Sequence, residues 1–315
     1  MTRPLTVSWF VPVRHRNYDR MPASVWNRCL QLHPYLERLG VRCLVNDRRT
    51  ALRLAREARV RGAQVVFDLC VNYFDVTGRL GDGYGVTDRH RAECLAMTEV
   101  ADAVVTASAF IAGRAKEFHP RVVYFPDSID RAHFAWTKRY EPRLRRPLRA
   151  IWCGYGVKAT DLESVLPRLR ARGMEMIVVA DTKPRLSGPF EYIRWHHATL
   201  PRDLLRGDVC VAPRELDSPY NLGHSFFKIG IFLTQGIPAL ASPVPSYAEV
   251  LQPGATGLVC ASAAEWEEAL DRVSADPRLL ATWSAAASAV MRPFWSEYLA
   301  PEYARFFRDL AGLPP

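Results

Sequence analysis

Two lysines stand where their ammonium groups could meet a phosphate. Lys158 follows the turn Gly154-Tyr-Gly156, which ends an apolar run over residues 148–153. Lys228 lies about one turn into an apolar segment that follows a polar loop. An ammonium group is a compact point charge that binds phosphate oxygens. If both segments reach the same edge of a sheet, the two lysines could flank a diphosphate. Each lysine taken alone is equally consistent with simple solvent exposure.

The second lysine belongs to the stretch RELDSPYNLGHSFFKIGIFLTQGIP, residues 214–238. An apolar run over residues 208–213 precedes it and predicts a buried strand. A polar loop follows, then a helix predicted from about His224 to Gln235, which ends at Gly236. Free N–H groups and the helix dipole converge at such a helix start and suit an anion, so we expect the backbone of Leu222, Gly223 and His224 to contribute. The pattern also fits an ordinary strand–helix loop with nothing bound.

Strands and helices alternate along both halves of the chain. The pattern predicts helices over residues 24–39, 88–100 and 161–172, and a strand over 103–106 followed by a helix that Ser108 caps. Residues 127–149 are charged, contain Pro142 and Pro147 and show little periodicity, which is typical of a linker. The sequence therefore predicts an α/β protein with two doubly wound, Rossmann-like domains, over residues 1–140 and 146–292. Ligands of such domains bind at the carboxyl ends of the strands and in the cleft between domains.

Charge is distributed unevenly along the 315 residues. Residues 1–145 hold 24 Lys and Arg against 15 Asp and Glu, whereas the remainder holds 18 of each, so the first half carries the whole net charge of +9. That half could attract an anionic small molecule, an acidic polymer or an anionic membrane surface; the alternative is that the arginines only solvate helix faces. No zinc-finger spacing or RNP-like aromatic motif occurs, so nucleic-acid binding is not favoured.

The remaining compositional features indicate a cytoplasmic protein. The seven cysteines are scattered singly with no CxxC pair, which favours reduced thiols. The first apolar run is followed by no small-residue cleavage site, so we expect no signal peptide, and no run approaches the roughly 20 residues of a membrane helix. The high Arg and Ala content hints at a GC-rich bacterial genome.

Several kinds of catalytic or metal site lack their sequence patterns. There is no GxSxG, no P-loop and no GxGxxG after the first strand. His196 and His197 are adjacent, so on a strand they would point to opposite faces and chelate a metal poorly. Asp68 and Asp75 form no DxD pair. We therefore expect no metal site.

Three segments together resemble the nucleotide-sugar glycosyltransferases of the GT-B fold, most nearly the family-four-type retaining enzymes. Residues 100–108, VADAVVTAS, with 125–130, FPDSID, resemble the close of the family's N-terminal domain. Residues 152–158, WCGYGVK, resemble the start of its donor domain, and 223–238 resemble its donor loop and helix, G-x-S-x-x-K-x-x-E-x-x-x-x-G-x-P. The likeness covers nearly all of residues 100–290, and its strength lies in the order and spacing of the motifs.

The resemblance implies transfer of a sugar from a nucleoside diphosphate sugar with retention, without a metal, a cofactor or a protein nucleophile. Lys158 and Lys228 would stabilise the leaving diphosphate. The implied donor-binding residues are Gly154, Trp195, Glu215, Ser218, Tyr220, Asn221, Leu222, Gly223, His224 and Ser225, with Trp195 either stacking on the base or lying in the core.

The acceptor would bind the N-terminal half near His15, Arg16, Tyr18, Arg20, Asn72 and Asp75. It could be a small molecule, a lipid-linked sugar or another anionic molecule, and the basic half could contact the inner face of the membrane peripherally. The resemblance also implies that a terminal helix over residues 294–311 crosses back onto the N-terminal domain.

The sequence departs from the family pattern at three places. Ile231 stands where the family has a glutamate that binds the donor ribose, which leaves Glu215 and His224 as candidates for that part. The arginine that usually precedes the lysine of the first donor loop is missing, and residues 12–22 contain no glycine. The main alternative is therefore a GT-B-shaped protein that has lost donor binding and acts as a partner or scaffold. A nucleotide-sugar epimerase or a phosphorylase on the same fold is a third hypothesis.

Overall fold

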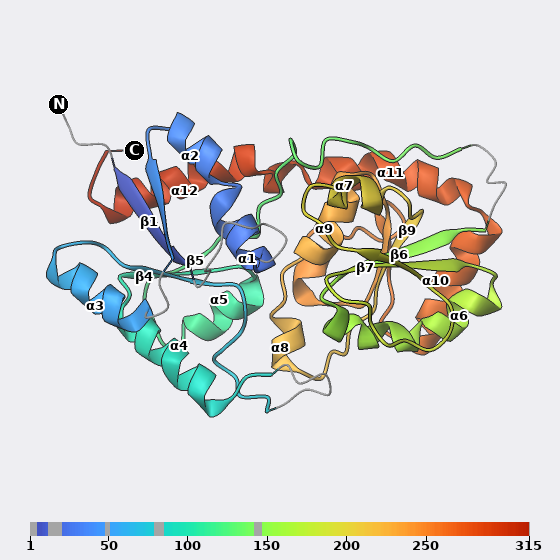
Figure 1. Ribbon diagram of the computed structural model, residues 1–315, viewed down its shortest axis with the longest axis horizontal. Coiled ribbons are helices and arrows are strands. Elements are labelled where there is room, and N and C mark those ends of the chain that lie inside the picture. The colour runs from blue at the N-terminus through green and yellow to red at the C-terminus, as the bar shows by residue number, and fades with distance from the viewer. Residues whose placement is uncertain (1–4, 12–20, 48–50, 79–84, 142–146, 315) are drawn as a thin grey trace. The chain divides into compact units, whose positions relative to one another are not determined.

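The computed structural model describes residues 5–11, 21–47, 51–78, 85–141 and 147–314 (Figure 1). These residues form two compact units. The first contains the described residues up to Asp130, the short segment Gly223–Ser225 and the residues from Pro293 onward; the second contains Arg131–Leu222 and Phe226–Arg292. Residues 131–140, which the sequence assigns to the first domain, thus pack with the second unit.

The first unit is built on two sets of parallel strands. β1 (Thr6–Val11) pairs with β2 (Arg42–Asp47), and β4 (Ala103–Thr106) lies between β3 (Val66–Leu69) and β5 (Val122–Tyr124). The helices α3 (Ala51–Val60), α4 (Asp88–Val100) and α5 (Ala109–Ala115) follow β2, β3 and β4 in turn. The side chain of Thr87 caps α4 and that of Ser108 caps α5, because each oxygen accepts a hydrogen bond from a free N–H of the first turn.

The helix predicted over residues 24–39 is not continuous. It consists of α1 (Ala23–Val25), the π-helical segment η2 (Trp26–Leu30) and α2 (His33–Arg38). The reason is the burial of polar side chains on this segment. Arg28 donates to Asp68 at 2.6 Å and to Asp127 at 3.0 Å, and Gln31 donates to the Ser128 hydroxyl at 2.8 Å. These long-range bonds fix the path of the backbone.

The C-terminal helix α12 (Ser296–Leu310) belongs to the first unit. Its buried face, which includes Tyr303 and Phe307, joins one hydrophobic cluster with Leu36 of α2 and Val105 of β4. Tyr303 stacks on Phe125 with ring centroids 4.2 Å apart. The last helix of the chain is therefore part of the core that the first strands and helices form.

The second unit contains one six-stranded parallel sheet. Its strands are β6 (Arg149–Gly154), β7 (Glu175–Ala180), β8 (Glu191–Arg194), β9 (Val209–Ala212), β10 (Ala239–Ala241) and β11 (Gly257–Val259), in the spatial order β11-β10-β9-β6-β7-β8. Every residue of β9 and β10 is buried, as expected for parallel strands covered on both faces. Figure 1 shows α9 on one side of this sheet and α6 and α10 on the other.

Several helices of this unit begin elsewhere than predicted. The 3₁₀ segment η3 (Gly156–Ser164) comes directly after β6, and α6 (Leu166–Ala171) begins only after it. The helix expected from His224 is instead α8 (Pro219–Leu222) and, after a break, α9 (Phe227–Thr234). Gly236 ends this region as predicted, with φ at 71°. The other helical segments are α7 (Leu200–Leu204), η4 (Pro245–Glu249), α10 (Ala263–Ala275), α11 (Arg278–Val290) and η5 (Arg292–Phe294).

No helix in the described ranges is both long enough and apolar enough to cross a membrane.

Candidate functional site

The strand order of the second unit places a topological switch between β6 and β9. From β6 the chain proceeds outward through β7 and β8, then returns to β9 on the other side of β6 and proceeds through β10 and β11. Residues Ala150 and Ile151 pair with Val209 and Cys210 across this point. The segments after β6 and β9 therefore diverge, and the crevice at such a point is where open α/β sheets bind their ligands.

The segment after β6 needs glycine at one position. The N–H of Gly156 donates to Asp181 at 2.7 Å, and a Cβ at this position would lie 2.3 Å from the backbone oxygen of Thr182. Only a residue without a side chain allows this approach. The glycine holds the start of η3 against the loop after β7, and this determines where Lys158, two residues later, begins its side chain.

Lys158 contacts an aromatic residue from the other side of the switch point. Its Nζ donates to the hydroxyl of Tyr220 at 2.6 Å and lies 4.9 Å from the centroid of that ring. Tyr220 is on α8, in the polar stretch after β9. The two loops that the sequence pairs are thus joined by their own side chains.

Lys228, in the first turn of α9, points toward the end of β6. Its Nζ lies 4.0 Å from the centroid of the Trp152 ring and 3.4 Å from the carbonyl oxygen of Cys153. A Cβ on residue 154 would lie 2.6 Å from the Trp152 ring and 3.0 Å from this Nζ, so Gly154 makes room for both the ring and the ammonium group. Burial, together with repulsion from Arg214, lowers the pKa of Lys228 to about 7. An anion bound here would reverse that shift.

Arg214 completes a cluster of three cations. It follows β9, and its charge lowers the pKa of Lys228, as the charge of Lys158 also does, while Asp161 opposes both. The Arg214 guanidinium lies 3.4 Å from a carboxylate oxygen of Asp161, and its Nη1 donates to Asn221 at 3.4 Å. The cluster of Lys158, Lys228 and Arg214 is therefore an electropositive site with one carboxylate against it.

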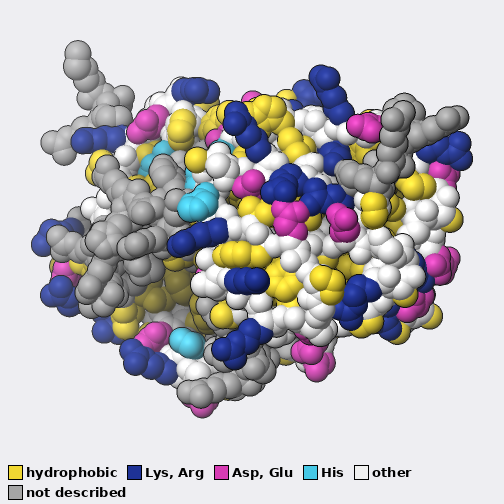
Figure 2. All heavy atoms as spheres, turned by 45° about the vertical axis from the view of Figure 1, so that its right-hand side comes forward, with side chains coloured by type: hydrophobic (Ala, Val, Ile, Leu, Met, Phe, Trp, Pro, Cys, Tyr) yellow, Lys and Arg dark blue, Asp and Glu magenta, His cyan; other side chains and the backbone are white. Residues whose placement is uncertain are grey.

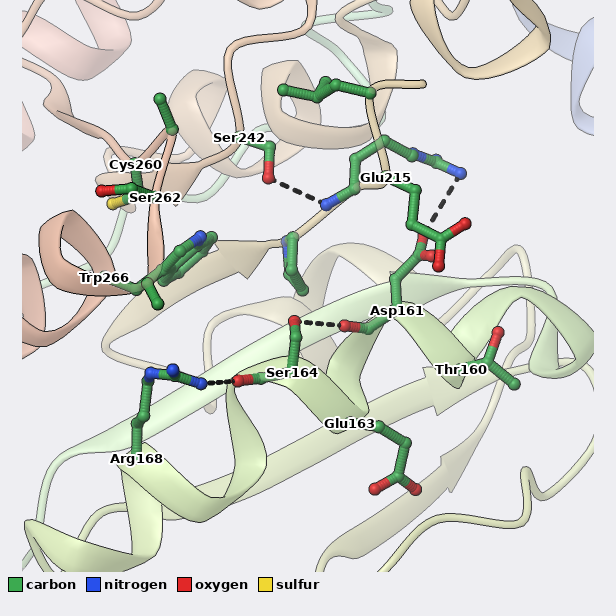
Figure 3. Close-up of a pocket in the computed structure, with 15 residues that line it drawn as sticks. Thr160, Asp161, Glu163, Ser164, Arg168, Glu215, Ser242, Cys260, Ser262 and Trp266 are labelled. Carbon is green, nitrogen blue, oxygen red and sulfur yellow. Dashed lines mark hydrogen bonds and ion pairs between the residues drawn. The ribbon is translucent and has the colours of Figure 1, made fainter. Parts of the chain in front are cut away.

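A cavity of about 380 Å³ adjoins this cluster in the second unit (Figure 3). Segments after β6, β9, β10 and β11 line it, with Asp161, Glu163, Glu215, Ser242 and Ser262 among their polar residues. In Figure 3, Glu215 and Asp161 lie on one side of the cavity and Trp266 on the other. Glu215 is exposed and makes no hydrogen bond or ion pair with any residue that the structure describes.

The other predicted donor residues fall into three groups. Tyr220 and Asn221 lie with the cation cluster, and the buried hydroxyl of Ser218 has no hydrogen-bond partner among the described residues. The N–H of Leu222 donates to the Ser218 carbonyl at 3.0 Å, so it is used within α8 and differs from the free donor that we expected. Trp195 follows β8 and is partly buried, and its backbone N–H donates to the carbonyl oxygen of Ala180.

The segment 223–225 belongs to the first unit. The hydroxyl of Ser108 donates to the Gly223 carbonyl at 2.9 Å, and the hydroxyl of Ser225 donates to Asp127 at 2.5 Å. These bonds are the physical reason why α9 begins at Phe227 and the helix does not start at His224. Donor contacts by Gly223, His224 and Ser225 stay a prediction.

Two of the predicted acceptor residues are described, and they contact each other. Asn72 is fully buried and donates to Asp75 at 2.8 Å, and Asp75 also forms an ion pair with Arg114 at 2.6 Å. Both side chains thus hold the loop after β3, and an acceptor role for them stays a prediction. His15, Arg16, Tyr18 and Arg20 lie outside the described residues.

Ile231 lies in the apolar core. It is 3% exposed, and α9 is buried on all sides from Ile229 to Thr234. An ionised carboxylate here would need a partner to offset its desolvation. The departure from the family pattern therefore coincides with a core position. Within the described ranges, no group of three or more His, Cys, Asp or Glu side chains could hold a metal ion.

Comparison with known proteins gives a match at the level of structure alone. No protein-family model and no curated protein matches the sequence. HepE of Anabaena, solved in complex with UDP-glucose, superposes with a TM-score of 0.69 at 10% identity over 97% of this chain and 100% of its own. A glycosyltransferase from Rickettsia africae gives 0.66 at 11% identity over 98% and 99%. Sucrose-phosphate synthase from Thermosynechococcus elongatus gives 0.64 at 15% identity over 81% and 71%.

The fold is that of the GT-B glycosyltransferases. This confirms the α/β class and the resemblance to the GT-B fold that the three sequence segments indicate; the likeness to family-four-type retaining enzymes stays a prediction. On this fold, the switch point between β6 and β9 is occupied in the present chain by Lys158, Lys228 and Arg214.

Sequence reasoning missed Arg214 and Asp161 as candidate site residues. Their places in the sequence could have suggested them. Arg214 is the first charged residue after the buried strand β9, and Asp161 follows Lys158 by one helical turn. Their pairing across the switch point depends on strand order, which the linear sequence does not contain.

Proposed function

We propose that this protein transfers a sugar from a nucleoside diphosphate sugar to an acceptor, with retention at the anomeric carbon. The observation that carries the proposal is the convergence of Lys158, Lys228 and Arg214 at the switch point of a parallel sheet. The GT-B fold supports it, because neighbours such as HepE are solved with UDP-glucose.

In the proposed mechanism the protein acts mainly through charge. When the bond between the sugar and the diphosphate breaks, negative charge develops on the leaving phosphate oxygen. Cations fixed beside that oxygen stabilise the charge more than they stabilise the ground state, which lowers the barrier. Lys158 is held by Tyr220 and Lys228 by the face of Trp152, so both are placed before the reaction begins. This chemistry requires neither a metal nor a protein nucleophile.

Nucleotide binding tests the proposal directly. Calorimetry with UDP, GDP, ADP and their glucose or mannose conjugates should detect binding of at least one of them by the wild-type protein. Lys228→Ala should abolish that binding, because it removes a cation that the diphosphate would contact. Lys183→Ala is a matched control, since the Nζ of Lys183 lies over the Phe190 ring, 5.9 Å from its centroid. A wild-type protein that binds no nucleotide would exclude the proposed activity.

One observation favours a second candidate, a GT-B-shaped protein that binds partners without catalysis. Ile231 is apolar and buried where the family places a ribose-binding glutamate. The same nucleotide panel separates the two hypotheses, because the scaffold requires no nucleotide. The retained lysines, held by Tyr220 and by the Trp152 ring, favour the enzyme.

A further inference from the structure

Arg214 is almost completely buried, yet its hydrogen-bonding capacity is mostly unused. Its side chain is 3% exposed. A guanidinium has five N–H donors, and the contacts of Arg214 to Asp161 and Asn221 both involve Nη1 at 3.4 Å. The guanidinium also interacts with the buried hydroxyl of Tyr247. Its Nε has no hydrogen-bond partner among the described residues. A buried cation with such weak pairing is costly for the fold.

Another buried arginine of this chain shows what full pairing looks like. Arg28 is 4% exposed, and its Nε donates to Asp68 at 2.6 Å, its Nη1 to Asp127 and to the Phe125 carbonyl at 3.0 Å each, and its Nη2 to Tyr303 at 3.3 Å. Each nitrogen of that guanidinium has a partner. Arg28 is thereby a structural residue, whereas the Nε of Arg214 has no hydrogen-bond partner among the described residues.

The surroundings of Arg214 identify the missing partner as an anion. The nearest charges include two further cations, Lys228 and Lys158, whose mutual repulsion an anion would relieve. Arg214 also forms part of the wall of the 380 Å³ cavity, so a group attached to that anion has room beside it. Planar guanidinium groups suit phosphate oxygens because they donate two parallel hydrogen bonds.

We propose that Arg214 is a third phosphate-binding residue of the site, contributed by the segment after β9, and that it replaces the arginine missing from the first donor loop. The inference rests on the proposed function for the identity of the ligand, a nucleoside diphosphate. The positive charge of the diphosphate site then comes from Lys158 after β6 and from Arg214 and Lys228 after β9, on the two sides of the switch point.

The first experiment compares Arg214→Gln with the wild-type protein by calorimetry, using UDP and inorganic diphosphate as separate probes. Loss of a charged hydrogen bond should weaken the binding of both probes by about tenfold or more. Arg172→Gln is the matched control, because Arg172 lies in the same unit but outside the cavity lining, and pairs with Glu267 at 2.7 Å and with Asp271 at 2.8 Å. The control should leave both affinities unchanged. Wild-type affinity in Arg214→Gln would overturn the inference.

A second variant keeps the test valid if Arg214→Gln does not fold. Asp161→Asn removes the carboxylate that faces Arg214. If Arg214 serves a phosphate, the loss of this competing negative charge should tighten the binding of both probes; weaker binding would mean that the pair is structural and would overturn the inference. Inorganic diphosphate also separates the two proposals. Arg214-dependent binding of diphosphate without any nucleotide binding would refute the function and retain Arg214, whereas wild-type protein that binds neither probe would refute both.

Discussion

Lys228 is the residue of the site whose protonation a ligand should change. Burial, followed by repulsion from Arg214 and Lys158, lowers its pKa to about 7, and Asp161 and Cys153 act in the opposite direction. A bound diphosphate favours the charged form and raises the pKa. Below pH 6 the ammonium is already charged, so affinity for UDP-glucose should be constant. Above pH 7 binding requires proton uptake, and the affinity should fall by up to about tenfold per pH unit.

Calorimetry in two buffers of different ionisation heat measures this uptake directly, and at pH 8 it should approach one proton. UDP-glucose is the appropriate probe because its phosphates do not titrate between pH 6 and 9. An affinity that stays constant from pH 6 to 9 without proton uptake would contradict the assignment.

The same shift has a consequence for the unliganded protein. Between about pH 7 and 10 the lysine is charged in the unfolded chain and mostly neutral in the folded one. The unfolded state therefore binds more protons, and the contribution of Lys228 to stability rises with pH across this window.

At the scale of elements, the contact between η3 and the loop after β7 depends on Gly156. Gly156→Ala would place a methyl group 2.3 Å from the Thr182 backbone oxygen, and neither backbone can yield easily. We expect a loss of about 1–3 kcal/mol in the free energy of unfolding and weaker UDP binding, since Lys158 moves with η3. Urea denaturation and calorimetry measure the two effects. Gly113→Ala in α5 is the control: a Cβ there meets nothing within 4 Å, so stability should rise by up to about 1 kcal/mol.

Sequence patterns predicted the elements whose signals are local. Strand 103–106, the Ser108 cap and the stop at Gly236 each depend on a few adjacent residues, and all three are present. The helices at 24–39 and 161–172 were predicted less well, because their backbones follow long-range contacts such as Arg28 with Asp127 and Gly156 with Asp181. For the same reason the sequence indicated the two lysines but not the Arg214–Asp161 pair, which needs the strand order.

At the scale of the whole molecule, the basic charge of the first half is dispersed. Several of its described arginines, among them Arg59, Arg89, Arg114 and Arg121, form ion pairs with carboxylates. On the face shown in Figure 2, basic side chains are interspersed with acidic and apolar ones. The four ion pairs favour the interpretation that these arginines solvate the surface. The acceptor and any membrane contact stay predictions.

The two units should respond separately to a core substitution. Phe307 of α12 packs against Trp9 with ring centroids 5.9 Å apart and belongs to the core of the first unit, whereas the cation cluster lies wholly in the second. Phe307→Ala should therefore lower the free energy of unfolding of the first unit by about 3–5 kcal/mol. At temperatures where the variant is folded, UDP affinity should equal that of the wild type. Urea denaturation and calorimetry measure these two quantities.

Arg305→Ala provides the control on the same helix. Its side chain is 62% exposed and pairs with Glu302 at 2.7 Å, so its removal should change stability by less than about 1 kcal/mol. If Phe307→Ala weakened UDP binding while Arg305→Ala did not, the donor site would depend on the packing of α12. Unchanged affinity in both variants would show that the residues of the second unit are sufficient to bind the nucleotide. We expect this outcome because Lys158, Lys228 and Arg214 all lie in that unit.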